Sequence, residues 1–211
     1  MSLTSTELEL CQSRPTQINY STIESLQFLG NYTRKLPVSM ARMMENALDW
    51  EHLPHVHSSS FAGIELIDKG SWGWRARTAL PGIDSGFQLI DLLIDVKNNY
   101  WATTVFDGPG TGIQIHTRAT TIDDGKIEIE VRFFSENFID RDNADFAYKL
   151  LRDQYAILYD EDVDLMSGRQ TALNRLLSKS ERTPQATEVL VDNADALTQL
   201  GKTLIETPQG R

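Results

Sequence analysis

The sequence predicts an α+β fold in which a curved antiparallel sheet of about six strands packs against one long C-terminal helix. Residues 61–134 hold short β-rich runs separated by turn residues, and Asp123-Asp124-Gly125 is a strong hairpin signal. Residues 146–179 then look helical for most of their length. A helix laid across the concave face of a curved sheet buries that face and leaves a pocket at one end. This is a helix-grip arrangement.

The remaining segments complete the predicted organisation of the 211 residues. Residues 1–20 are polar and lack periodicity, which predicts a flexible arm or a segment that orders against a partner. Residues 21–180 form the helix-grip domain, which includes an amphipathic helix at 38–52 that ends near Pro54. Residues 181–211 are a polar C-terminal tail.

Composition excludes several classes of protein. A single cysteine, Cys11, excludes internal disulfides, thiolate zinc sites and cysteine-bound iron–sulfur clusters within the chain. A net charge of −10 would repel a phosphate backbone, so nucleic acid is not an expected partner. No apolar run approaches the roughly 20 residues that cross a bilayer, and the N-terminus does not read as a secretory signal. We therefore expect a cytoplasmic protein that does not enter membranes.

Three of the four histidines fall within six positions, at His52, His55 and His57. On an uninterrupted helix the side chains of His52 and His57 would diverge by roughly 140°. Pro54 lies between them, and a proline disfavours helix at the residue before it. The helix should therefore end near His52, and the chain can turn so that His57 returns to the same point.

Two imidazoles and one carboxylate form the facial triad that holds Fe(II) in non-haem sites. The C-terminal helix supplies acidic candidates in the sequence YDEDVDL. Asp162 shares a helical face with apolar residues and should point toward the core, whereas Asp160 and Asp164 should face water. Asp162 is therefore the predicted third ligand beside His52 and His57.

The residues upstream of His52 have a spacing that would let their side chains hold its imidazole in place. Asn46, Asp49 and His52 lie three apart, on one face of the predicted helix. A carboxylate one turn before a ligating histidine can accept the imidazole N–H that faces away from the metal. Asp49 is therefore predicted to hold His52 in place.

Less specific interpretations of these residues remain open. Histidines at a helix end can cap carbonyls or lie in solvent, and an acidic run is often a solvated helix face. His55 could replace either neighbouring histidine, and His116 is expected to be structural. The aromatic residues of the sheet are expected to form core or pocket wall, and the candidates for substrate contact are Phe61, Trp72, Trp74 and Trp101.

The segment ENALDWEHLPHVH resembles the catalytic-domain motif of the Rieske non-haem iron aromatic-ring-hydroxylating oxygenases. That motif runs Glu-Asn, two residues, Asp, two residues, His, four residues, His, and here it ends in Asp49, His52 and His57 without a gap. Glu161-Asp162, with Gln170 eight residues later, resembles the segment that carries the third iron ligand of the family. The resemblance covers about residues 25–178, the START-like or SRPBCC-like catalytic domain.

The resemblance implies an oxidoreductase in which His52, His57 and Asp162 hold Fe(II) and activate dioxygen on an apolar or aromatic substrate. It implies that Asn46 and Asp49 belong to the catalytic site and that Asp49 links a ligand histidine to the electron donor. It also implies a homo-oligomer, by analogy a trimer. The chain departs from the family because it has no Rieske domain, so electrons would come from a separate Rieske or ferredoxin-type protein.

Two other functions remain open. One is a metal-independent helix-grip protein that binds a hydrophobic small molecule. The other is a cofactor-free hydrolase or cyclase in which His52, paired with Asp49, acts as general base.

Overall fold

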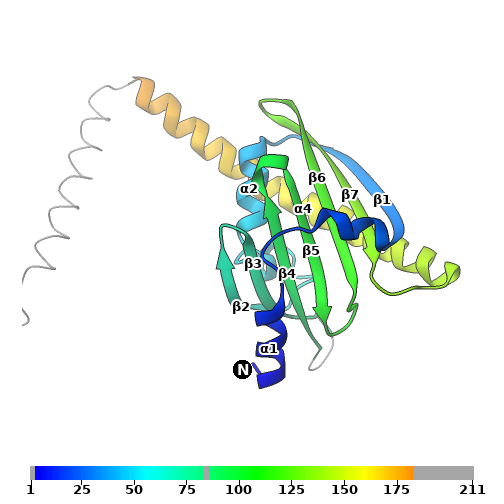
Figure 1. Ribbon diagram of the computed structural model, residues 1–211. Helices are drawn as coiled ribbons and strands as arrows, with labels where there is room; N and C mark the ends of the chain where they lie inside the picture. Colours follow the sequence, from blue (N-terminus) through cyan, green and yellow to red (C-terminus); the bar gives the residue numbers. More distant parts are fainter. Residues whose placement is uncertain (1–2, 83–85, 183–211) are drawn as a thin grey trace, which may run out of the picture. The chain divides into compact units, whose positions relative to one another are not determined.

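The computed structural model describes residues 3–82 and 86–182, so residues 183–211 of the predicted tail lie outside the described residues. The elements form one antiparallel sheet and a long helix that runs behind it in the view of Figure 1. This confirms the predicted α+β helix-grip class. The sheet has seven strands: β1 (Gln27–Leu36), β2 (Gly63–Gly70), β3 (Gly73–Ala79), β4 (Phe87–Asp95), β5 (Tyr100–Asp107), β6 (Ile113–Asp123) and β7 (Lys126–Ser135).

The strands lie in the order β1-β7-β6-β5-β4-β3-β2, and every neighbouring pair is antiparallel. Strands β2 to β7 fall within the predicted β-rich region, and short connections join them. The sheet core contains large side chains without solvent exposure, such as Phe133 and Ile129. Alternate residues of each strand reach this core.

The seventh strand, β1, was not predicted. Its sequence QFLGNYTRKL has no clean alternation, because it lies at the edge of the sheet with several residues half-buried. The segment is held as a strand by its pairing with β7, which lies about 100 residues later in the chain. Gly30 lets α4 approach closely, since a Cβ there would lie 2.4 Å from the ring of Tyr148.

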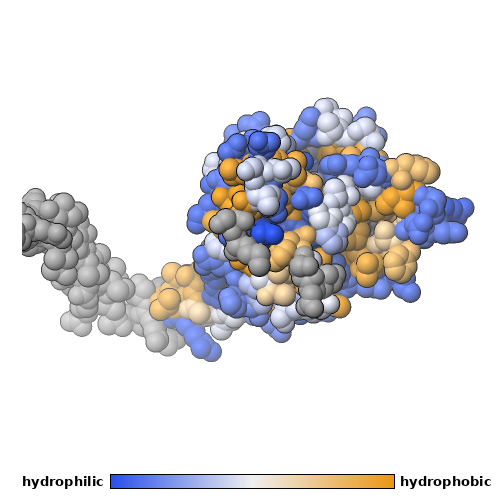
Figure 2. Space-filling view, turned by 90° about the horizontal axis from the view of Figure 1, so that it is seen from below, coloured by the Kyte–Doolittle hydropathy of each residue, from blue (hydrophilic) through white to orange (hydrophobic). Residues whose placement is uncertain are grey.

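The long helix, α4 (Arg141–Arg182), begins five residues before the predicted start. The chain divides into two compact units, Met1–Ser167 and Gly168–Arg211, so α4 belongs to both. In the first unit α4 packs Tyr155 and Tyr159 against the core and exposes Phe146, Leu150 and Ile157. Apolar patches lie among hydrophilic residues on the face shown in Figure 2. The homo-oligomer implied by the resemblance stays a prediction.

The face of the sheet opposite α4 carries the N-terminal segment, which Figure 1 shows in front of the strands. This segment contains α1 (Ser5–Ser13), within residues 1–20 for which the composition predicts a flexible arm or a segment that orders against a partner, and the 3-10 helix η1 (Tyr20–Ser25). Thr4 and Glu7 cap α1 reciprocally, and Cys11 is buried. Glu7 and Arg14 of this segment form ion pairs with Arg77 and Asp91 of the sheet, and its local sequence does not reveal these contacts.

No helix among the described residues has the length and apolar character that a membrane span requires.

His116 lies buried on β6, on the face away from α4, where its Nδ1 is 2.9 Å from the hydroxyl of Tyr100. Its expected structural role stays a prediction. Burial, with a smaller contribution from Arg132, lowers the pKa of His116 to about 4 from 6.5. The unfolded chain therefore binds a proton at a higher pH than the folded chain does. The stability due to neutral His116 is complete above pH 6.5 and is lost as the pH falls toward 4.

We expect His116→Gln to remove this part of the pH dependence. Between pH 7 and pH 4 the free energy of unfolding of the wild type should fall by on the order of 2–3 kcal/mol more than that of the variant. Urea unfolding at several pH values measures the difference. Parallel pH profiles for the two proteins would contradict it.

Candidate functional site

The structure brings His52, His57 and Asp162 together. One ligand atom from each lies within 4.8 Å of the others, and all three side chains are at most 10% exposed. Asp162 comes from α4, and both histidines come from the segment between β1 and β2. We call these three residues the cluster.

Two short helices place the histidines, instead of the single helix predicted at 38–52. Helix α2 (Met40–Leu48) ends four residues before His52, and α3 (Leu53–Val56) follows with Pro54 in its first turn. Proline is tolerated there because the N–H groups of the first turn have no helical partner. His52 is the N-cap of α3 and His57 its C-cap, so both lie at the ends of one helical turn. Their ring centroids are 5.2 Å apart.

Both ring nitrogens of His57 face carboxylates. Nδ1 is 2.7 Å from Glu161 and Nε2 is 3.0 Å from Asp162. A neutral imidazole donates through only one nitrogen, so this arrangement favours the protonated ring. Burial alone would lower the pKa of His57, but hydrogen bonds and charge attraction from Asp162 and Glu161 raise it above 6.5.

Asp162 remains ionised although it is buried. Burial alone would raise its pKa, but the nearby imidazole of His52 and the hydrogen bond from His57, with a smaller contribution from Asn46, lower it to about 2. Asn46, a predicted site residue, is buried and lines the same cavity as the three residues of the cluster.

His52 is the least satisfied member of the cluster. Both of its ring nitrogens are buried without a hydrogen-bond partner, and Nε2 lies 3.5 Å from Asp162. Buried imidazole nitrogens normally have a partner. Two imidazoles and one carboxylate therefore meet at one point, and the ring nitrogens of one imidazole have no hydrogen-bond partner. This arrangement fits the ligand set of a divalent metal ion. The role of the cluster as metal ligands stays a prediction.

The predicted support of His52 by Asp49 is wrong. Asp49 makes no hydrogen bond to either nitrogen of His52. The reason is that α2 ends at Leu48 and Asp49 is its C-cap, so Asp49 and His52 do not follow each other on one helical face. The proposed general-base pair of His52 and Asp49 is not formed either. Instead Glu161 contacts a histidine of the cluster, and its only sequence signal was its place next to Asp162.

His55 is exposed on α3 and is not part of the cluster. Asp160 and Asp164 are also exposed, as the helical pattern of α4 predicted. Asp160 pairs with Arg34 of β1 instead. Helix geometry therefore selected the aspartate that faces inward, whereas the sequence had left open whether His55 replaces one of the other two histidines.

A cavity of about 110 Å³ adjoins the cluster, between the concave face of the sheet and α4. We call it the cluster cavity. Phe61, Trp74 and Trp101 line it, and Asp49 reaches it too. Apart from Asp162, sequence reasoning missed the lining residues from α4, because the helical pattern did not show which tyrosines meet the sheet. The other main lining residues are Met43, Leu53, Ile90, Leu92, Thr103, Tyr155, Leu158 and Tyr159.

Trp72, a predicted substrate contact, does not line this cavity. It lies in the turn between β2 and β3, with the Arg75 guanidinium 5.1 Å from its ring centre. Trp72 and Trp74 were both predicted as candidates for substrate contact, but only Trp74 lines the cavity. The turn breaks strand alternation at Gly73, whose φ of +126° favours glycine.

A second cavity of about 200 Å³ continues along the same groove, and we call it the glutamine cavity. Its polar lining residues are Ser60, Gln88, Thr103 and Gln154. The two cavities share Phe61, Ile90, Thr103, Tyr155 and Leu158.

No family model matches the sequence, and no curated protein matches it. Solved structures do. The Zhui aromatase/cyclase from Streptomyces sp. R1128 has a TM-score of 0.56 at 11% identity, with 68% of this chain and 95% of that chain covered. Norcoclaurine synthase from Thalictrum flavum, in complex with dopamine and hydroxybenzaldehyde, has a TM-score of 0.51 at 13% identity, over 74% and 95%.

The di-domain ARO/CYC StfQ from the steffimycin biosynthetic pathway has a TM-score of 0.52 at 12% identity, over 67% of this chain and 46% of that chain. None of the three carries the name of a Rieske oxygenase. At such low identities the likeness concerns the fold alone. The chain therefore has the helix-grip fold of these proteins.

Proposed function

We propose that the protein binds an apolar or aromatic small molecule in the groove between the sheet and α4. The observation that carries this proposal is the pair of adjoining cavities, with aromatic walls and few polar groups. The helix-grip neighbours support it, since one of them was solved with two small aromatic molecules. Trp74 and Trp101 would form much of the contact surface.

The test is binding of a neutral aromatic probe, N-phenyl-1-naphthylamine, followed by its fluorescence. Leu158 lines both cavities, so Leu158→Trp should fill the groove and weaken binding at least ~10-fold, or about 1.4 kcal/mol. Ile157→Trp is the matched control, because Ile157 is the next residue of α4 and is 50% exposed. Equal binding by both variants, or no binding by the wild type, would exclude the proposal.

A second function is favoured by a specific observation, the convergence of two histidines and one aspartate at one end of the groove. We propose that His52, His57 and Asp162 hold Fe(II), as in the oxygenases that the motif resembles. Fe(II) held by such a set supplies the chemistry that activates dioxygen. The apolar walls would exclude water and present the substrate to the cluster, and Glu161 would orient His57.

Electrons for this second function would come from a separate Rieske or ferredoxin-type partner. Anaerobic loading with Fe(II) separates the two functions. Uptake of about one ion per chain by the wild type supports the second function. No uptake by the wild type, together with probe binding that persists in His52→Ala and His57→Ala, supports the binding function alone.

A further inference from the structure

The two cavities form one long site. Along β4, Leu92 lines the cluster cavity, Ile90 lines both, and Gln88 lines the glutamine cavity. Alternate residues of a strand share a face, so these three positions span about 13 Å. Along α4, the distance from Asp162 to Leu151 corresponds to about 16 Å of helix. The groove is therefore long and narrow.

The end of the groove away from the cluster is polar and uncharged. Within residues 3–82 and 86–182, no residue that lines the glutamine cavity has a charged side chain. Among the described residues, the side-chain amide of Gln154 makes no hydrogen bond, although the residue lines the cavity. A free amide can both donate and accept, which suits a hydroxyl, carbonyl or amide group.

A carboxylate would be poorly held at that end. Burial of an anion without a cationic partner costs much more than burial of a neutral group that forms a hydrogen bond. The acidic side chains that line the cluster cavity, Asp49 and Asp162, would repel an anion placed at that end of the groove as well. An anionic ligand therefore has no favourable orientation, and a cationic group would have no charged partner among the described residues of the glutamine cavity.

From this geometry we infer that the ligand is an elongated, uncharged molecule about 13–16 Å long. Its one hydrogen-bonding group lies at Gln154 and Gln88, and its apolar end lies beside the cluster. This inference rests on the proposed binding function and specifies the substrate class of the same groove. It also determines which end of the molecule meets His52 and His57.

Displacement of bound N-phenyl-1-naphthylamine tests the inference with four pure compounds: hexanol, decanol, tetradecanol and decanoate. Decanol should bind at least ~10-fold more tightly than decanoate at pH 7.5, which corresponds to the cost of an unpaired buried charge. Affinity should rise from hexanol to decanol and stop rising at tetradecanol, because the cavities end. A continuing rise would contradict the proposed length.

Polarity alone favours an alcohol over an ionised acid in any apolar groove, so a variant is needed. Gln154→Leu should weaken decanol binding about 3- to 10-fold, the effect of one lost hydrogen bond, when the affinity is expressed relative to that of the probe for the same variant. Gln170→Leu on the same helix is the control, because Gln170 lines neither cavity. Unchanged decanol binding in Gln154→Leu, or tighter binding of decanoate, would overturn the inference. Absence of probe binding to the wild type would instead reject the binding function itself.

Discussion

Asp162→Ala should reduce the affinity for Fe(II) or Co(II) at least ~100-fold. The carboxylate is one of three candidate ligand atoms that lie within 4.8 Å of one another, so its removal leaves only two imidazoles. By contrast, loss of a residue that only forms a hydrogen bond with a metal ligand usually lowers metal affinity about 10- to 100-fold. For that reason Glu161→Gln, which alters the partner of His57, should cause a smaller loss of about 10-fold.

Anaerobic equilibrium dialysis measures the affinities, and the visible spectrum of bound Co(II) reports the ligand set without any turnover. Asp164→Ala is the matched control, since Asp164 is exposed on the same helix two residues later. Asp162→Asn keeps the shape of the side chain and guards against a variant that fails to fold. Unaltered affinity in both Asp162 variants, or no uptake by the wild type, would contradict a metal site at the cluster.

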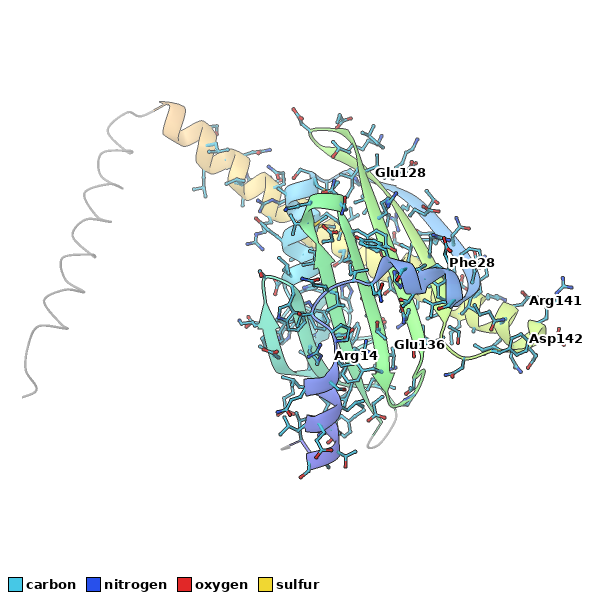
Figure 3. All side chains as sticks on the ribbon, in the orientation of Figure 1. Arg14, Phe28, Glu128, Glu136, Arg141 and Asp142 are labelled. Atoms are coloured by element: carbon cyan, nitrogen blue, oxygen red, sulfur yellow. The ribbon has the colours of Figure 1, made fainter. Side chains whose placement is uncertain are left out.

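Asp91→Asn should lower the free energy of unfolding by about 3–5 kcal/mol, the usual cost of breaking a buried ion pair. The carboxylate has no solvent exposure, and it accepts a hydrogen bond from Arg14 Nε at 2.9 Å. Arg75 lies 3.6 Å away and also donates to the carbonyl oxygens of Cys11 and Pro15. Figure 3 shows Arg14 where the chain leaves α1 in front of the sheet. The substitution would leave two arginines without an anionic partner.

Urea unfolding of the whole chain measures this loss. Asp153→Asn makes the same chemical change in an exposed pair with Arg152, and it should alter stability by less than ~0.5 kcal/mol. If Asp91→Asn lowers the free energy of unfolding by less than about 1 kcal/mol, water solvates the two arginines well enough to compensate for the lost carboxylate. The same result would mean that the ion pairs do not hold α1 against the sheet.

Local patterns in the sequence predicted most of the fold and part of the site. Alternating β-rich runs and the long helical pattern identified six strands and α4, because residue periodicity follows directly from backbone geometry. The same reasoning selected Asp162 over Asp160 and Asp164, since the faces of a helix are set by its period. The edge strand β1 was missed, because its partner β7 is distant in the chain and its own residues are only half-buried.

The partners of each site residue could not be derived in this way. Asp49 was assigned to His52 on the assumption of one continuous helix, but α2 ends at Leu48. Glu161 has that supporting contact with His57 instead, across more than 100 residues of chain. Trp72 does not line the cavity, because it lies in the turn between β2 and β3 and not within a strand.

The sequence by itself determined which secondary structures form and which residue types could supply a metal site, because both depend on neighbours within a few positions. Only the tertiary structure decided which histidine nitrogen meets which carboxylate, and that the cavity continues past Tyr155 to an uncharged end. Those features depend on how α4 lies across the sheet. Contacts between distant segments are set by packing of the whole domain, and no local pattern records them.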